Sequence, residues 1–197
     1  EAWSIRWYKN MIGDCSADVV SSTVPCSTKW MVGTVNSFYI GIIATVIATA
    51  LGTLAALGLS RPHMPYKGLI MAILISPMIV PLIITAAGMF FFYARINLVY
   101  TFTGVILAHV ALATPFVVIT VTATLVGFDM NMVKAAQSLG AKPMRTFFKV
   151  IMPLILPGII SGALFAFITS FDEVVIVMFM ASIDQLTIPK QMWAGIR

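Results

Sequence analysis

Two adjacent carboxylates, Asp172 and Glu173, interrupt an otherwise uncharged stretch from Val150 to Ile183. An acidic residue at the centre of a membrane helix costs about 2.5–3.5 kcal/mol on insertion scales, so it is retained where it faces a partner or a water-filled cavity. Adjacent helical residues point about 100° apart, so the two carboxylates need not share one role. Two interpretations are open: a cation site on a transport path, or a structural pair with a basic residue or freed backbone N–H groups.

The remaining polar residues predict no catalytic centre. His63 and His109 each stand alone, and the sequence has no Gly-x-x-x-x-Gly-Lys-Ser/Thr loop to cradle ATP phosphates. We predict that His109, inside an apolar stretch, is a packed, hydrogen-bonded residue rather than a proton relay. Cys15 and Cys26 lack metal-ligand spacing, and a disulfide between them is left open. The prediction is therefore a non-enzyme without an ATPase site, a metal or a cofactor.

Four long apolar stretches supply the elements that must position these residues. The chain is 60% hydrophobic and 10% charged, whereas a soluble domain carries roughly 25% charged residues. Since about 20 apolar residues cross a bilayer, we predict an all-α, polytopic transmembrane bundle. The expected spans are about 33–59, 68–92, 102–126 and 155–179. In the first span, small residues at every fourth position predict close helix packing: Ala44, Ala48, Gly52 and Ala56.

Basic residues concentrate in two connections, 60–67 and 127–149. They are Arg61, Lys67, Lys134, Lys142, Arg145 and Lys149. Cytoplasmic loops carry an excess of Lys and Arg, so both connections are expected on the cytoplasmic side. Orientation thus accounts for the net charge of +5, and nucleic acid is not an expected partner. Residues 1–32 are then an outer segment. We expect one span upstream and one after Arg197, which gives six in the intact protein.

The second basic connection is predicted to form two short helices. Asn131 is the expected N-cap of the first helix, and Gly140 is its expected stop. A second helical piece follows Pro143, and Pro153 re-enters the membrane. A short amphipathic helix at this place either lies on lipid headgroups or docks into a groove of a partner.

This connection resembles the cytoplasmic "EAA" loop of permease subunits of bacterial binding-protein-dependent ABC importers. Ala135-Ala136, Gly140 and Val150-Ile-Met-Pro153 match its pattern of Glu-Ala-Ala, a Gly and a later Ile-x-Leu-Pro. The resemblance implies a type I importer permease fold. Its coupling loop, residues 127–153, fits a cleft on a separate ATPase subunit and transmits the closure of that subunit. The implied coupling residues are Lys134, Ala135, Ala136, Leu139, Gly140, Phe147 and Pro153.

Lys134 departs from that pattern, which has Glu at this position. With Asn131 as the N-cap, Lys134 takes the place of a capping-box Glu, and its charge opposes the helix dipole. The expected local cost is roughly several tenths of a kcal/mol. We expect a tolerated variant.

Three further segments resemble the spermidine/putrescine branch of these permeases. They read Ser4-Ile-Arg-Trp-Tyr8, Ser170-Phe-Asp-Glu-Val-Val175 and Leu186-Thr-Ile-Pro-Lys-Gln-Met-Trp193. This resemblance implies an extended, multivalent cation as the substrate. Asp172, Glu173 and Phe171 are then the expected substrate-path residues, and Phe171 and Trp193 could add cation–π contacts.

The sequence therefore predicts a multi-pass inner-membrane permease subunit of an ATP-driven importer, with residues 1–197 in one transmembrane domain. The expected solute is a small cation, most simply a polyamine. Expected partners are cytoplasmic ATPase subunits, a second permease (identical or homologous), a periplasmic solute-binding protein and the lipid bilayer. The alternatives are an ion-gradient-driven secondary transporter and the same permease role with another substrate. A secondary carrier has no need of a helix–Gly–helix docking element, so the loop discriminates between the two classes.

Overall fold

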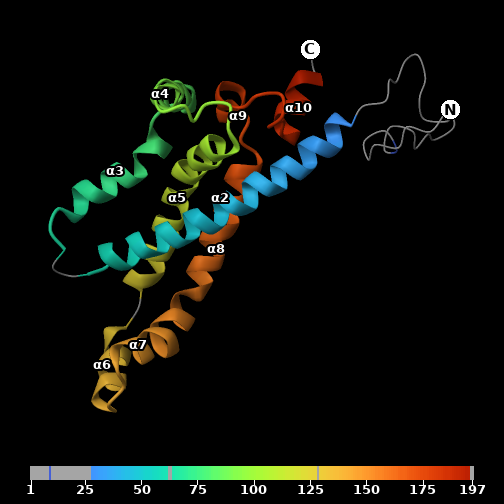
Figure 1. Cartoon of the computed structure of the whole chain (residues 1–197). Coiled ribbons are helices and arrows are strands. Elements are labelled where there is room, and N and C mark those ends of the chain that lie inside the picture. The colour runs from blue at the N-terminus through green and yellow to red at the C-terminus, as the bar shows by residue number, and fades with distance from the viewer. Residues whose placement is uncertain (1–8, 10–27, 62–63, 128, 196–197) are drawn as a thin grey trace, which may run out of the picture.

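The computed structural model describes residue 9 and residues 28–61, 64–127 and 129–195. Within these ranges the secondary structure is helical and contains no strand (Figure 1), as the composition predicts. The segment Ser4–Tyr8, Cys15, Cys26 and His63 lie outside the described residues. The disulfide between Cys15 and Cys26, which the sequence leaves open, therefore also lies outside the described residues.

Three helical segments in the described ranges are long and apolar enough to cross a membrane. They are α2 (Lys29–Leu59), α5 (Phe102–Val126) and a continuous segment, Pro143–Phe171. The last consists of α7 (Pro143–Thr146), the π-helix η1 (Phe147–Ile151) and α8 (Met152–Phe171). The helix that contains most of the fourth expected span, 155–179, thus begins before that span and ends before the carboxylates.

The second expected span, 68–92, is not one straight helix. It consists of α3 (Lys67–Ile79) and α4 (Leu82–Arg95), which are bent by 105° at their junction. Pro81 forces the preceding Val80 into an extended conformation, with ψ of 135°. Pro77 and Pro81 also lack the N–H groups that helix bonds need. The prolines therefore break the stretch 68–92, which its length and composition predict as one span, into two helices.

Helix α5 lies at the centre of the bundle, packed between α2 and α8. The small-residue stripe of α2 is buried as predicted: Ala44, Ala48 and Ala56 are fully covered, and a Cβ on Gly52 would meet Val117 of α5 at 2.6 Å. On the other side, Gly158 and Gly162 of α8 lie directly against α5. Small residues therefore let all three backbones approach closely.

Gly162→Ala is expected to destabilise the bundle, because the new Cβ would lie 2.5 Å from Thr120 Oγ1 and 3.0 Å from the Val117 Cα. Overpacking of this kind costs about 1–3 kcal/mol, so the thermal unfolding midpoint in detergent should fall. Gly88→Ala in α4 is the matched control, since a Cβ there meets nothing within 4 Å and alanine favours a helix. Equal midpoints for the two variants would contradict this packing.

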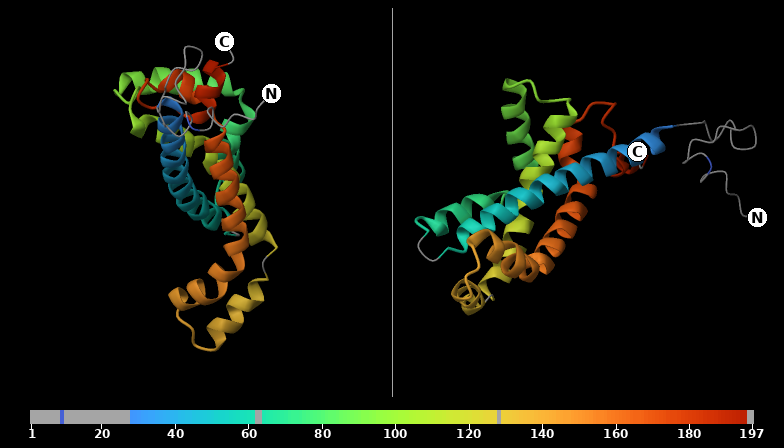
Figure 2. Two further views of the ribbon diagram at one scale, coloured as in Figure 1. Left: turned by 90° about the vertical axis from the view of Figure 1, so that its right-hand side faces the viewer. Right: turned by 60° about the horizontal axis from the view of Figure 1, so that its bottom comes forward.

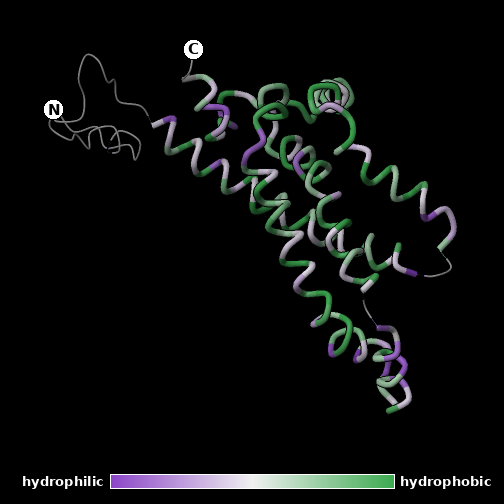
Figure 3. The backbone as a smooth tube through the Cα atoms, turned by 180° about the vertical axis from the view of Figure 1, so that it is seen from behind, coloured by the Kyte–Doolittle hydropathy of each residue, from purple (hydrophilic) through white to green (hydrophobic). Residues whose placement is uncertain are grey.

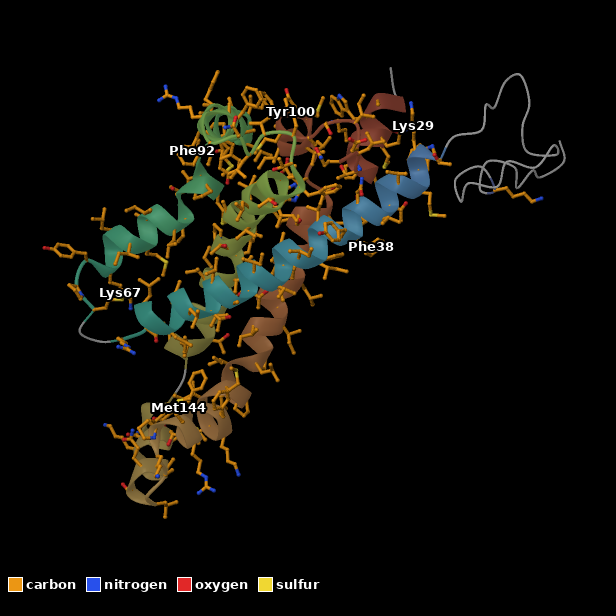
Figure 4. All side chains as sticks on the ribbon, viewed as in Figure 1. Lys29, Phe38, Lys67, Phe92, Tyr100 and Met144 are labelled. Carbon is orange, nitrogen blue, oxygen red and sulfur yellow. The ribbon has the colours of Figure 1, made fainter. Side chains whose placement is uncertain are left out.

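The two basic connections lie at the same end of the bundle, as the charge distribution predicts. Figure 4 labels Lys67 and Met144 at this end and Lys29 and Tyr100 at the opposite end. Hydrophobic residues run along the bundle between the two ends, and hydrophilic residues gather at the tip beyond it (Figure 3). We call the end with Lys67 and Met144 the coupling end.

At the opposite end, the chain that follows α9 (Val175–Met180) is hydrogen-bonded to α2. Asn36 Nδ2 donates to the carbonyl oxygens of Asp184 and Leu186, at 2.8 and 3.0 Å. Ser37 Oγ accepts from the N–H of Ile188, the first residue of α10 (Ile188–Gly195), at 2.9 Å. These bonds fix the segment between α9 and α10.

Candidate functional site

The predicted coupling loop projects beyond the bundle. Figures 1 and 2 show α6 (Met130–Ser138) and α7 extending beyond the other helices at the coupling end. There they pack against each other and η1. Asp129, rather than the expected Asn131, caps α6: its carboxylate accepts from the Asn131 N–H at 2.9 Å. Asp129 is preferred because a carboxylate also suits the positive end of the helix dipole.

The change of cap also changes the role of Lys134. With α6 beginning at Met130, the capping-box position falls on Met132, two residues before Lys134. Lys134 is exposed and lies in the second turn, where the dipole effect is weak. The predicted energetic cost of Lys134 at a capping-box position is therefore wrong. Lys134 in place of the Glu of the EAA pattern leaves the N-cap of α6 intact.

Gly140 stops α6 as predicted, through a Schellman arrangement. Its φ is +79°, in the left-handed region that favours glycine. The N–H of Gly140 donates to the Gln137 carbonyl at 2.9 Å, and the N–H of Ala141 donates to the Ala136 carbonyl at 3.1 Å. Helix α6 and α7 are thus joined by a defined turn.

Helix α6 has apolar residues on two faces. Val133 is buried and Ala136 is half-buried, and the helix as a whole packs against α7 and η1. Met132, Ala135 and Leu139 follow at helical spacing on the exposed side, and Leu139 is 88% exposed. We call these three residues the exposed stripe. Of the other expected coupling residues, Pro153 is exposed and Phe147 is half-buried.

Phe147 and Phe148 connect this element to the bundle. They belong to η1 and line a groove of about 650 Å³ against Thr53, Leu54 and Leu57 of α2. A π-helix inside a longer helix is often found at functional sites. The sequence gives no signal for it, because its residues are compatible with an ordinary α-helix.

The two carboxylates lie in the break between α8 and α9, and the structure separates them. Asp172 is exposed, whereas Glu173 is 7% exposed. Glu173 Oε1 accepts from the N–H of Ile176 at 2.9 Å, in the first turn of α9. One oxygen of Glu173 therefore has the structural role that the sequence left open, as a partner of a freed backbone N–H.

Glu173 also lines a cavity of about 390 Å³. The other walls are Thr169 of α8, Leu112 and Phe116 of α5, and the break between α3 and α4 from Pro77 to Leu82. Pro77 cannot donate to the Ile73 carbonyl, and Ser76 Oγ donates there instead at 2.8 Å. Pro81 likewise has no N–H for the Pro77 carbonyl. Carbonyl groups freed in broken membrane helices suit cations.

The expected aromatic residues lie apart from this cavity. Phe171 packs in a ring cluster with Phe38 and Phe167, with centroids at 5.3 and 5.5 Å. Trp193 is on α10, at the opposite end from the coupling loop, and 49% exposed. On the same helix, Lys190 Nζ donates to the Ala181 carbonyl at 3.0 Å, and partial burial lowers its pKa.

His109 is a packed, hydrogen-bonded residue, as predicted. It is 1% exposed on α5, and its Nδ1 shares a hydrogen bond of 2.7 Å with Ser170 Oγ on α8. Its Nε2 has no hydrogen-bond partner among the described residues. This bond crosses between two spans just before the carboxylates.

Residues 24–195 match the family model described as "Binding-protein-dependent transport system inner membrane component". The chain belongs to this family, which confirms the predicted resemblance, the helical membrane fold and the inner-membrane location. Its members are transport components without ATPase activity, so the chain is not an enzyme.

Three relatives illustrate the range of the family. The chain is 31% identical over 163 residues to a spermidine/putrescine transport system permease protein of Haemophilus influenzae, covering 83% of the chain and 63% of the relative. A putrescine transport system permease protein of Escherichia coli is 29% identical over 203 residues (99% and 67%). A trehalose transport system permease protein of Mycobacterium tuberculosis is 33% identical over 144 residues (73% and 53%). The chain spans about two thirds of the length of the two polyamine relatives.

Proposed function

We propose that the chain is a membrane-spanning permease subunit of an ATP-driven importer, in which α6 and α7 dock on a separate ATPase subunit. The observation that carries this proposal is the exposed stripe of Met132, Ala135 and Leu139, held beyond the end of the bundle. An amphipathic helix uses such spaced anchors to bind a groove. Family membership supports the same role.

The helical path from this element to the carboxylates supports a mechanism of alternating access. Pro143–Phe171 is continuous, and Asp172 and Glu173 follow directly. When the ATPase subunits close, a displacement of α6 and α7 passes through η1 into α8 and reaches the cavity at its other end. A second permease subunit completes the pathway, and a loaded periplasmic binding protein docks at the opposite end.

Leu139→Ser should reduce the stimulation of ATPase activity by loaded binding protein several-fold, because an apolar anchor is lost from the docked face. The bundle should stay intact, since Leu139 makes few contacts at 88% exposure. Leu139→Met is the matched control, because methionine keeps an apolar side chain of similar volume at the same exposed position. Equal ATPase stimulation in both variants would count against docking through the exposed stripe.

We further propose that the solute is a polyamine. The cavity offers the carboxylate of Glu173, the hydroxyl-bearing Thr169 and a carbonyl freed by Pro81, which is a set of acceptors for a primary ammonium group. The names of two relatives support spermidine or putrescine. The trehalose relative is the reason to test a neutral sugar beside them.

Competition for uptake tests the substrate. The intact transporter in vesicles, supplied with ATP and binding protein, should take up labelled spermidine. Excess unlabelled putrescine or spermidine should reduce this uptake, and excess trehalose should leave it unchanged. Uptake of labelled trehalose that polyamines do not affect would retain the permease role and overturn the polyamine substrate.

A further inference from the structure

The hydrogen bond between His109 and Ser170 joins α5 to α8 directly before the break between α8 and α9. Ser170 is in the last turn of α8, which ends at Phe171, and the carboxylates follow at once. Both partners are buried, at 1% and 5% exposure. The bond therefore ties the end of α8 to α5 immediately before the break.

Two further hydrogen bonds hold the break itself, one toward α9 and one toward α8. Glu173 Oε1 accepts from the Ile176 N–H at the start of α9, and the Asp172 N–H still donates to the Ile168 carbonyl of α8. The stretch around Glu173 is thus short and anchored at both ends. A shift of the last turn of α8 would move the carboxylate with it.

The same helix that carries His109 also forms the facing wall of the cavity. Leu112 and Phe116, one and two turns further along α5, line it together with Thr169 and Glu173. The distance between this wall and the carboxylate therefore depends on how α5 and α8 are aligned. The bond from His109 to Ser170 is a polar contact between α5 and α8 next to the cavity, and it helps to hold the two helices in this alignment.

We propose that His109 is a positioning residue, which holds the Glu173 carboxylate in the cavity by fixing the last turn of α8 to α5 through Ser170. It thereby sets the apparent affinity of the transporter for its cationic solute. This inference rests on the proposed polyamine transport. His109 itself is not among the lining residues of the cavity, so its effect passes through Ser170.

Paired substitutions separate positioning from packing. Asparagine at 109 can place a polar atom near the position of Nδ1 and can keep the bond to Ser170, whereas glutamine places its amide near Nε2, which has no partner among the described residues. Ser170→Ala removes the partner oxygen with almost no change in volume, and Ser170→Thr retains the hydroxyl. A role in packing alone would favour the larger glutamine over asparagine.

The test is the initial rate of ATP-dependent spermidine uptake against spermidine concentration, normalised to the amount of transporter in the membrane. His109→Gln and Ser170→Ala should each raise KM about fivefold, the size expected for one lost hydrogen bond, with the maximal rate nearly unchanged. His109→Asn and Ser170→Thr should keep KM near that of the wild type. In a Glu173→Gln background, Ser170→Ala should cause no further rise, because the carboxylate it positions is gone.

Two outcomes would overturn the inference. One is an unchanged KM in Ser170→Ala. The other is a rise in KM that is equally large with and without the Glu173 carboxylate. If His109→Gln fails to reach the membrane, Ser170→Ala alone decides. Absence of ATP-dependent spermidine uptake in the wild type would instead reject the proposed polyamine transport, and this inference with it.

Discussion

Gly140→Val is expected to abolish most of the coupling between ATP hydrolysis and transport. Valine is a β-branched residue that does not tolerate the φ of +79° at this position. A left-handed conformation costs even an ordinary residue about 1–2 kcal/mol, and a helix as short as α6 is only marginally stable by itself. The turn should therefore open and displace the exposed stripe, which should lower ATPase stimulation by loaded binding protein about tenfold or more.

Gly140→Asn is the matched control, because asparagine is the non-glycine residue most often found at this helix position. It should retain most of the stimulation, while basal ATP hydrolysis should be similar in both variants. Unchanged stimulation in Gly140→Val would show that the turn does not matter for coupling.

Glu173→Gln is expected to raise the half-saturating polyamine concentration for uptake by about 10- to 100-fold, as expected for the loss of a hydrogen bond to a charged group. The substitution is specific: the amide oxygen of glutamine can still accept from the Ile176 N–H, as Glu173 Oε1 does at 2.9 Å. The cap of α9 is therefore kept while the charge in the cavity is lost. Insertion into the membrane should be unaffected.

Asp172→Asn is the comparison, because Asp172 is exposed whereas Glu173 is buried. An exposed charge contributes little, so the change in half-saturation should be about twofold. A double variant, Asp172→Asn with Glu173→Gln, that transports polyamine like the wild type would eliminate the carboxylates from the substrate path.

The apolar stretches could be predicted to be spans because each is long and bounded by charged residues, and the first three contain no charge. The first and third expected spans, 33–59 and 102–126, correspond to α2 and α5. The bend at Pro81 could not be predicted, since a proline in a membrane helix either kinks or breaks it according to what neighbouring helices offer the freed carbonyls. Here the cavity between α3, α5 and Glu173 lies beside the break.

Gly140 predicts the main outline of the coupling loop, because glycine readily adopts the left-handed conformation that ends a helix. The N-cap was misplaced because Asp129 and Asn131 are both good capping residues and lie two apart. The division of α6 into a buried and an exposed face depends on η1 and α7, which fold back on it, so Leu139 could not be placed from the local sequence.

The carboxylates themselves were evident from the sequence, since charges are costly in an apolar stretch. Their different environments were not, because the cavity joins Glu173 to residues near Pro77 and Leu112 that are distant in the chain. The sequence predicts a hydrogen bond for His109, but it does not identify Ser170 as the partner, for the same reason. A buried polar pair across two spans leaves no local pattern in a single sequence.

The most direct test of the permease proposal is the energy source for uptake. The intact permease, its ATPase subunits and its binding protein are reconstituted in liposomes, and labelled spermidine uptake is measured with ATP, with a non-hydrolysable analogue and with ionophores that collapse ion gradients. We predict uptake that requires hydrolysable ATP and persists in the presence of ionophores. Uptake without ATP that follows an imposed ion gradient would contradict the proposal and indicate a secondary transporter.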